Sequence, residues 1–574
     1  MKLSDFVIKY LEDYGIKNIY SVTGGMCMHL TDSISRSNIK LISTMHEQGA
    51  GIAAEGDCIY NNNLAVLLTT AGPGILNAIN PITSAWIDGN PLLIISGQCK
   101  TADMKFNTGL RQKGVQEVDA VSLLKNITKY STTILDANDI KRELAKAIHE
   151  ATTGRKGPVF LEIPLDIQVK QINDSMELYN FNTTCLPLVY LSLLDNLMDL
   201  INQSKKPVIM VGNGVRSSGG LNIFKSLINK LKIPILLTWK SKDFLDDSNI
   251  YNFGMPGSIS TYYANYVLQN CDLLICIGTR LDLPTVAYDY TNFAKKAIKV
   301  IIDIDQAEIE KLNFNLNFNI DAKDFLSFLY GNSKSITVDT SEWLTECINY
   351  KNKYPHIPLV ESCDIDPYEF IRKLSIWCNS TDIIVASSSG SASEITCQSF
   401  NIKEGQRFIC SNGLGSMGYA ISHSIGVVVA SGRKVICIEG DGSFQMNLSE
   451  LELIRRYNLP IKIFILNNGG YNSIRNTQNK FLNGNLVACN EQSGLSFPNV
   501  KKIAELYELQ YIKINKECIL DTNIHAALYN NDATIIEVII DSNVQTQPKV
   551  QNSMNSNGKI ILGTLENLWP FINN

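Results

Sequence analysis

The sequence predicts an α/β fold with three doubly wound parallel-sheet domains and a C-terminal tail. Short apolar, β-branched segments such as 435–439 and 461–466 alternate with segments of helical periodicity. Most of the apolar segments end at a glycine-rich or polar turn, as buried parallel strands do. Polar stretches near 171–197 and 331–362 separate three such sets and are expected to be linkers. The expected units are 1–170, 190–330, 362–545 and the tail 546–574.

Composition limits the function classes. The chain has 574 residues, 45% of them hydrophobic and 19% charged, which indicates a large globular core. A net charge of −5 supplies no basic field for nucleic acid or anionic lipid, and no apolar run reaches the ~18 residues of a membrane span. The N-terminal segment carries acidic residues, unlike a signal peptide. The 14 cysteines form no CxxC pair, so we expect reduced core cysteines and a cytoplasmic location.

The most informative stretch is 435–478. Gly440-Asp441-Gly442-Ser443 follows one predicted strand, and Asn467-Asn468 follows the next. Because parallel strands end at the same edge of a sheet, Asp441 and Asn468 are expected to meet there. Their oxygens suit Mg²⁺ or Ca²⁺, and the nearby backbone N–H groups suit phosphate. The alternative is an ordinary βαβ unit in which Asp441 caps a helix.

This combination resembles the diphosphate and metal motif of thiamine diphosphate (ThDP) enzymes. The flanking FQMNLSEL and LPIKIFILNN are similar to the acetolactate synthase branch of that superfamily. The resemblance implies that Asp441, the Asn468 side chain and the Gly470 carbonyl hold Mg²⁺. It also implies that Gly442, Ser443, Asn468 and Tyr471 lie at the cofactor.

The first domain is expected to contain strands at 18–22, 41–44, 64–69, 91–96 and 158–163. Glu47 follows the second of these and precedes a helix, where an acid can simply complement the helix dipole. However, HEQGAG and TTAGPGILNAI resemble the pyrimidine-binding domain of ThDP enzymes. The resemblance implies that Glu47 is the catalytic acid that promotes the reactive tautomer of the aminopyrimidine. It places four further residues around the same pocket: Gly25, Pro73, Asn77 and Gln116.

The middle domain is expected to contain strands at 207–211, 234–237, 273–277 and 299–304. The turn Gly212-Asn213-Gly214 could mark a nucleotide-dependent oxidoreductase, but the full glycine fingerprint is missing. GTRLD and IDIDQAEI resemble segments that contact FAD in this family. The resemblance implies a structural FAD with Arg280 as its contact.

The third domain is expected to open with a helix near 365–367, followed by a strand at 383–386. A loop of small residues then includes Ser389, Gly390 and Ser391, and such loops cradle phosphate through backbone N–H groups. The alternative is a flexible turn. SNGLGSMG resembles a segment of this branch whose methionine, here Met417, lies beneath the cofactor and bends it.

The acceptor substrate is suggested by departures from the family pattern. Acetolactate synthases carry an arginine where this sequence has Pro284, and a tryptophan where it has Thr477. Loss of the guanidinium weakens recognition of a second 2-keto acid. The YNSIRNTQ loop and the tail resemble the yersiniose-type enzymes, which attach two-carbon branches to keto-sugars. We therefore expect pyruvate decarboxylation and transfer of the two-carbon unit to a carbonyl acceptor, such as a nucleotide-linked 4-keto-deoxysugar.

Two alternatives remain open. The first is acetolactate formation from two pyruvates, and the second is an inactive paralogue that serves as a binding subunit. The family places its cofactor between subunits, which implies at least a homodimer and a plausible homotetramer.

Overall fold

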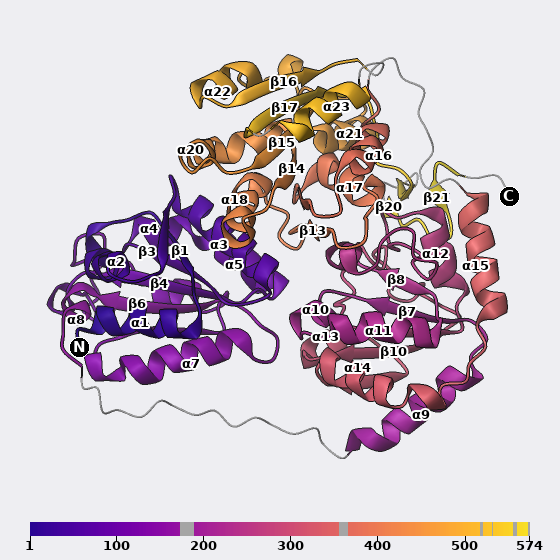
Figure 1. Cartoon of the computed structure of the whole chain (residues 1–574), viewed down its shortest axis with the longest axis horizontal. Helices are drawn as coiled ribbons and strands as arrows, with labels where there is room; N and C mark the ends of the chain where they lie inside the picture. The colour runs from indigo at the N-terminus through magenta and orange to yellow at the C-terminus, as the bar shows by residue number, and fades with distance from the viewer. Residues whose placement is uncertain (173–188, 355–364, 517–519, 531, 555–559, 572–574) are drawn as a thin grey trace.

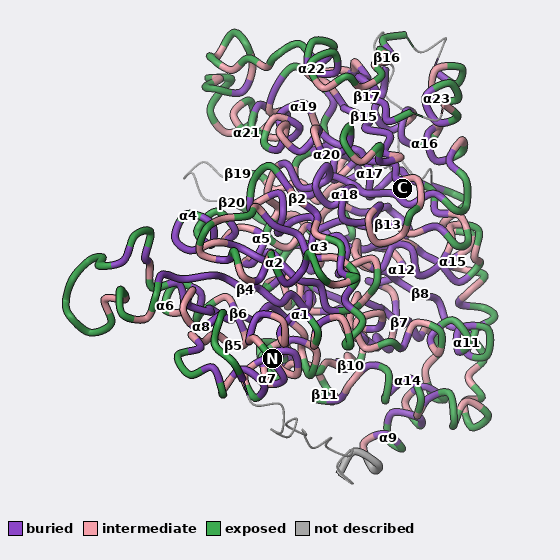
Figure 2. The backbone as a smooth tube through the Cα atoms, turned by 60° about the vertical axis from the view of Figure 1, so that its left-hand side comes forward, coloured by how far each residue is buried: buried purple, intermediate pink, exposed green. Residues whose placement is uncertain are grey.

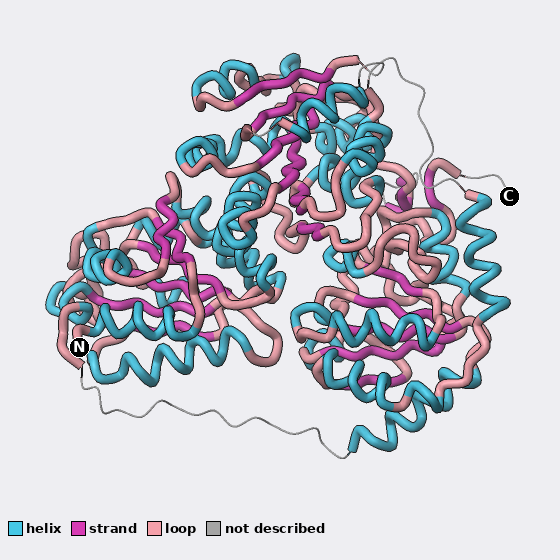
Figure 3. The backbone as a smooth tube through the Cα atoms, viewed as in Figure 1, coloured by secondary structure: helices cyan, strands magenta, loops and turns pink. Residues whose placement is uncertain are grey.

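Three lobes, each built on one parallel sheet, form the molecule (Figure 1). The structure is a computed structural model and describes residues 1–172, 189–354, 365–516, 520–530, 532–554 and 560–571. Figure 3 shows the strands of each sheet inside its lobe, with helices packed around them. The predicted fold class, three parallel-sheet α/β domains, is confirmed.

The first sheet has six strands in the order β2-β1-β3-β4-β6-β5, and all of its neighbouring pairs are parallel. Apolar segments form its central strands because both faces are covered by helices. The strands are β1 (Asn18–Ser21), β2 (Lys40–Ser43), β3 (Ala65–Thr69), β4 (Leu92–Gln98), β5 (Tyr130–Thr133) and β6 (Val159–Pro164). The helices are α1 (Leu3–Tyr14), α2 (Met28–Ser35), α3 (Glu47–Asn61), α4 (Pro73–Asn77), α5 (Ile79–Asp88), α6 (Ala120–Leu124), α7 (Ile140–Thr152) and α8 (Leu165–Gln168).

The second sheet has five parallel strands in the order β11-β10-β9-β7-β8. Its strands are β7 (Pro207–Val211), β8 (Ile235–Leu237), β9 (Leu273–Ile277), β10 (Ile298–Asp303) and β11 (Leu316–Asn319). Its helices are α9 (Val189–Gln203), α10 (Gly214–Ser217), α11 (Leu221–Leu231), α12 (Tyr262–Asn270), α13 (Gln306–Glu310), α14 (Ala322–Gly331) and α15 (Ser341–Lys353).

The third sheet has six parallel strands in the order β13-β12-β14-β15-β17-β16. Its strands are β12 (Ile383–Ala386), β13 (Arg407–Ile409), β14 (Val435–Gly440), β15 (Ile461–Asn467), β16 (Gln510–Ile514) and β17 (Thr534–Ile539). Its helices are α16 (Pro367–Trp377), α17 (Gly390–Ser399), α18 (Tyr419–Ser431), α19 (Asp441–Phe444), α20 (Leu451–Arg456), α21 (Asn472–Phe481), α22 (Val500–Leu506) and α23 (Leu520–Tyr529).

The tail packs on the middle domain. Two strand pairs form within it: β18 (Lys549–Val550) with β21 (Leu568–Trp569), and β19 (Ser553–Met554) with β20 (Ile560–Ile561). The Val550 N–H donates to the Ser258 carbonyl at 2.7 Å, and Leu568 is buried against Tyr262 and Tyr354. These contacts fix the tail to the lobe that contains α12.

Helices α3 and α18 join the first and third domains at close range (Figure 1). A Cβ atom at Gly426 would lie 1.8 Å from the Ala53 carbonyl oxygen, and one at Gly56 would lie 2.5 Å from that of His423. Only glycine allows backbones to approach this closely. The two domains therefore share a core, which also contains Ala50 and Ile421.

Some details of the predictions are wrong. α9 begins at Val189, inside the predicted linker 171–197, and α15 lies inside the predicted linker 331–362. Residues 173–188 and 355–364 of those linkers lie outside the described residues. Strands β5, β11, β13, β16 and β17 are not among the predicted elements. No helix in the described ranges is long and apolar enough to cross a bilayer.

Candidate active site

Strands β14 and β15 bring Asp441 and Asn468 to the same sheet edge. Gly440 is paired with Leu466, so the segments that follow β14 and β15 leave the sheet side by side. The Asp441 side chain is 4% exposed and accepts N–H groups from Gly442 at 2.8 Å and Gly470 at 3.0 Å. Burial raises the pKa of Asp441 to about 6. A carboxylate in this setting gains from a nearby cation.

The side-chain oxygen of Asn468 is buried and has no hydrogen-bond partner among the described residues. Such an orphaned acceptor is costly unless a ligand satisfies it. Together with the Asp441 carboxylate it offers the hard oxygen atoms that Mg²⁺ prefers. The residues present therefore fit a divalent cation at this edge.

The predicted diphosphate loop lies at the neighbouring strand end. β12 and β14 are adjacent, and the chain turns away from the sheet in opposite directions after them, which makes a topological switch point. Gly390 has a φ of +71° and begins α17, while the Asn472 amide donates to the Ser391 hydroxyl at 3.3 Å. Ser389 directly precedes the helix. Backbone N–H groups at the start of α17 therefore face the crevice in which a phosphate would bind.

The turn after β14 is shaped by close packing. A Cβ atom at Gly442 would lie 2.4 Å from the Tyr471 ring, so only glycine lets this ring cover the turn. The Ser443 hydroxyl accepts the Gly418 N–H at 2.7 Å and thereby ties the turn to the segment that contains Met417. These predicted cofactor residues thus belong to one cluster at the carboxyl edge of the sheet.

Glu439 is a further member of this cluster that is not among the predicted site residues. It is fully buried, and its carboxyl group accepts hydrogen bonds from the Ser387 hydroxyl and the Ala420 N–H. Burial raises the pKa of Glu439. The sequence indicates Glu439 only as an acidic residue near the end of an otherwise apolar strand.

Glu47 is the first residue of α3 and its side chain is 9% exposed. The Asn77 amide donates to Glu47 Oε2 at 3.0 Å, as their predicted proximity requires. A Cβ atom at Gly74 would lie 3.5 Å from the other oxygen, Oε1. One carboxylate oxygen is therefore held by Asn77, and the other faces a glycine.

The remaining first-domain residues lie at the ends of neighbouring strands. Pro73 begins α4, and a Cβ atom at Gly72 would lie 2.3 Å from the Gln116 carbonyl oxygen. Gly25 begins a short 3₁₀ helix after β1. Pro73, Gln116 and Gly25 are exposed, and Figure 2 shows a long exposed arch beside α6. This face of the first domain is open to solvent.

The Glu47 cluster belongs to the first domain and the Asp441 cluster to the third. Among the described residues, no hydrogen bond links the two groups.

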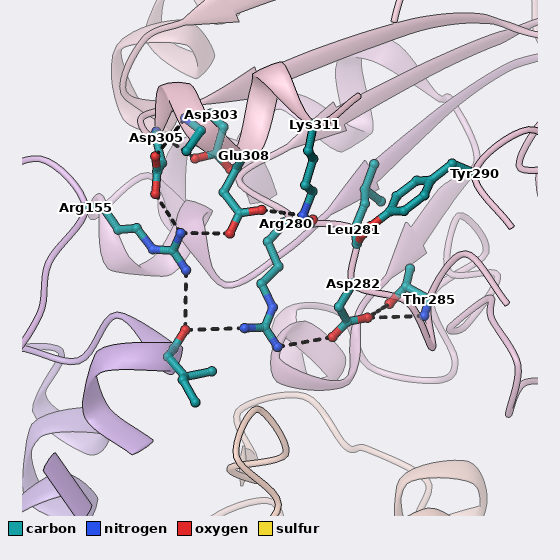
Figure 4. Close-up of polar contacts among 12 residues, drawn as sticks. Arg155, Arg280, Leu281, Asp282, Thr285, Tyr290, Asp303, Asp305, Glu308 and Lys311 are labelled. Atoms are coloured by element: carbon teal, nitrogen blue, oxygen red, sulfur yellow. Dashed lines mark hydrogen bonds and ion pairs between the residues drawn. The ribbon is translucent and has the colours of Figure 1, made fainter. Parts of the chain in front are cut away.

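A large cavity of about 1060 Å³ lies where the three domains meet. Its lining includes the Gly212-Asn213-Gly214 turn, Arg280 and Asp303 of the middle domain and Ser389 and Gly390 of the third. The Arg280 guanidinium donates to the Ile87 carbonyl at 3.4 Å and to Asp282 at 3.3 Å (Figure 4). Arg155 bridges the same domains through Asp305 at 2.6 Å and Glu308 at 2.8 Å.

The glycines of the 212–214 turn have a packing role. A Cβ atom at Gly212 would lie 2.4 Å from the Gly278 carbonyl oxygen, and one at Gly214 would lie 2.6 Å from the Gly278 Cα atom. These glycines let two strand-end turns touch, as in an ordinary turn between a strand and a helix. Asp303 ends β10 at the same cavity, and burial raises its pKa to about 6.

Three family models match the chain, and each describes a domain of thiamine pyrophosphate enzymes. They are the N-terminal TPP binding domain over residues 1–123, the central domain over 194–329 and the C-terminal TPP binding domain over 388–538. The chain therefore belongs to the thiamine pyrophosphate (thiamine diphosphate) enzyme family.

Relatives narrow this class to its acetolactate synthase-like members. The acetolactate synthase large subunit of Lactococcus lactis subsp. lactis is 31% identical over 565 residues, which cover 97% of this chain and 96% of the relative. The probable acetolactate synthase large subunit of Methanocaldococcus jannaschii is 31% identical over 563 residues, covering 94% and 92%. The chloroplastic acetolactate synthase of Arabidopsis thaliana is 28% identical over 578 residues, covering 98% and 85%.

Proposed function

We propose that this protein uses thiamine diphosphate to decarboxylate pyruvate and to join the two-carbon unit to a carbonyl acceptor. The unpartnered Asn468 oxygen beside the buried Asp441 carboxylate carries the proposal, because the pair suits a cation that bridges to a diphosphate. When bound, the cofactor supplies the electron sink for decarboxylation. The protein supplies binding, orientation and proton transfer.

The third domain grips the diphosphate end. Asp441, the Asn468 side chain and the Gly470 carbonyl would hold Mg²⁺. Backbone N–H groups of 389–391 and of 442–443 bind the phosphate oxygens, in keeping with the start of α17 at the crevice. The Tyr471 ring covers the turn at Gly442, and Met417 would support the bound cofactor from below.

The first domain grips the pyrimidine end. Glu47 holds the proton that is exchanged with the ring, and Asn77 keeps its carboxylate in place. Gly25, Pro73 and Gln116 line the same pocket. Release of CO₂ from C1-labelled pyruvate, with ThDP and Mg²⁺ supplied, tests this function. No release from pyruvate would refute it.

We also propose a homodimer as the smallest active unit, with a homotetramer as the full assembly. Support comes from the exposed surface around Gly25, Pro73 and Gln116. It also comes from the lack, among the described residues, of a hydrogen bond between the Glu47 cluster and the Asp441 cluster. A second copy would bring its Asp441 cluster to this Glu47. Sedimentation should show no active monomer, whereas a monomer with full activity would contradict the proposal.

We propose a structural FAD in the three-domain cavity. The volume of about 1060 Å³ accommodates a dinucleotide, Arg280 offers its guanidinium to a diphosphate, and Asp303 can accept ribose hydroxyls. Flavin absorbance of the purified protein, retained after ThDP is removed, tests this assignment. A colourless protein that does not take up added FAD would refute it.

For the acceptor we propose a keto-sugar, in the manner of the yersiniose-type enzymes. Pro284 lines the cavity at the position where the family arginine is expected, and Arg280 nearby is already held by Asp282. The names of the relatives favour acetolactate formation from two pyruvates instead. Supplying pyruvate alone separates the two, because fast acetolactate formation would contradict the sugar proposal.

The cysteines agree with a reducing compartment. The free cysteines in the described part of the chain are all buried, including Cys276 and Cys437 within strands. We therefore propose a cytoplasmic location, which fractionation of the source cells would test.

A further inference from the structure

The loop that leads into Glu47 is held by the third domain of the same chain. Glu450 lies between α19 and α20 and is completely buried. Its Oε1 accepts the N–H of His46 at 3.0 Å, and its Oε2 accepts the N–H of Met45 at 3.4 Å. A carboxylate 404 residues further along the chain therefore accepts hydrogen bonds from the backbone directly ahead of Glu47.

A second contact holds the other end of the loop. Arg456 lies six residues after Glu450, and its guanidinium donates to the Ser43 carbonyl at 2.6 Å. Residues 43–46 thus lie between a carboxylate that accepts two N–H groups and a guanidinium that donates to a carbonyl. The segment 450–456 therefore holds both ends of the loop 43–46 by hydrogen bonds.

The first turn of α3 is shaped to admit this carboxylate. A Cβ atom at Gly49 would lie 2.3 Å from Glu450 Oε1, so any other residue would displace the carboxyl group. His46 caps α3, with its side chain accepting the Gln48 N–H at 3.1 Å. A negative charge at this helix end is favourable because the helix dipole is positive there. The contact is therefore specific to a glutamate facing a glycine.

We propose that Glu450 is the positioning residue for Glu47, fixing the start of α3 so that the Glu47 carboxylate faces the cofactor ring. The inference rests on the proposed function, because it assumes that Glu47 acts on the cofactor. Catalytic groups must be held closely, and a misplacement of about 1 Å can cost about a hundredfold in rate. Glu450 supplies the restraint without touching substrate.

The sequence offers a matched control. Glu452 lies two residues further along the same segment, has a partly exposed side chain and pairs with Arg455. In the full-length enzyme loaded with ThDP and Mg²⁺, Glu450→Gln should lower kcat for pyruvate decarboxylation about tenfold to hundredfold. KM should change little, because Gln retains one acceptor and the substrate pocket is untouched. Glu452→Gln should keep both parameters.

The pH profile provides a readout that a purely structural role would not move. Burial raises the pKa of Glu450 to about 7, and protonation removes one of its two acceptor oxygens. The ionisable groups around it are His46 and Glu47 at the start of α3, Arg456 and Tyr507. Wild type and Glu452→Gln should lose kcat as the pH falls through about 7, whereas Glu450→Gln should lack this limb.

Hydrogen exchange of the Met45 and His46 amides in the cofactor-free protein supplies a second readout, with protection lost in Glu450→Gln and kept in Glu452→Gln. Gly49→Ala should reproduce the kinetic change by displacing the carboxyl group.

Equal kinetics in Glu450→Gln and Glu452→Gln would overturn the inference while leaving the proposed function intact. A fall in activity that merely follows a fall in thermal midpoint, in Glu450→Gln and Gly49→Ala, would overturn it as well. Wild type that releases no CO₂ from pyruvate marks failure of the proposed function itself.

Discussion

Asn77 donates a hydrogen bond of 3.0 Å from its side-chain amide to Oε2 of Glu47. The bond joins the end of α4 to the start of α3, so two strand-end segments of the first domain meet at one carboxylate. Oε1 is left facing Gly74. An acid held by one oxygen and open at the other is suited to exchange a proton with a ligand.

Glu47→Gln should therefore abolish most decarboxylation. Glutamine keeps the shape and can still accept from Asn77, but it cannot hold the exchanged proton. We expect a loss of about 10²- to 10⁴-fold in kcat, the usual contribution of general acid–base catalysis. CO₂ release from pyruvate measures it, with the exposed Glu505→Gln as control. Near-normal activity in Glu47→Gln would refute the assigned role.

Asn468→Ala should weaken the cation-dependent binding of ThDP. The substitution removes the buried oxygen that has no partner in the described protein. Without it, a divalent cation at this site would have one protein ligand fewer, which would weaken cation-dependent binding of the cofactor. The rise in thermal midpoint on adding ThDP with Mg²⁺ should shrink, whereas the exposed Asn479→Ala should keep the full rise. An unchanged rise in Asn468→Ala would remove Asn468 from the cation site.

Asp243→Asn should destabilise the junction of the domains. Asp243 is almost completely buried and accepts from Arg216 at 2.9 Å and from Arg407, in the third domain, at 2.7 Å. The two guanidinium groups hold the pKa of Asp243 below its ordinary value despite burial. Removing its charge leaves Arg216 and Arg407 uncompensated, at a cost of about 3–5 kcal/mol. Denaturant unfolding should show the loss, and Asp13→Asn, on the surface, should not.

Glu162 should make stability depend on pH. It is buried between Gln98 at 2.9 Å and Thr133 at 2.8 Å, and burial raises its pKa to about 7. A raised pKa means that the folded state keeps a proton which the unfolded chain releases. The contribution of Glu162 is therefore complete below about pH 4.5 and is lost as the pH rises through about 7.

Glu162→Gln removes this dependence. Between pH 5 and pH 8, the variant should gain up to about 3 kcal/mol of unfolding free energy relative to wild type. Unfolding midpoints measured across that range test the sign, with Glu505→Gln expected to follow wild type. A constant difference between Glu162→Gln and wild type would show that Glu162 does not titrate in this window.

Most of the buried central strands could be predicted because apolar runs reveal them directly, and the exception is β17. β7, β9 and β12 occupy the expected residues, and both faces of each are covered. Four of the edge strands could not be predicted in this way, whereas the edge strands β2 and β8 overlap the expected segments 41–44 and 234–237. β5, β11, β13 and β16 each lie at the edge of a sheet and contain half-exposed residues, so their sequences lack a long apolar run.

The residues of the candidate site could be predicted only where they belong to a recognisable sequence motif. Asp441, Asn468 and Glu47 each follow a strand, and strand order brings such ends together. Glu450 could not be found in this way, because its partners are 404 and 405 residues away and are backbone atoms. Backbone partners leave no mark on the sequence except at Gly49, which must stay small.

The most direct measurement is the structure of the protein crystallised with ThDP and Mg²⁺. We expect the cation to bind Asp441, the Asn468 side-chain oxygen and the Gly470 carbonyl, with the ring end of the same cofactor at Glu47 of a second subunit. A cofactor bound elsewhere, or a cation that leaves the Asn468 oxygen unpartnered, would contradict the account.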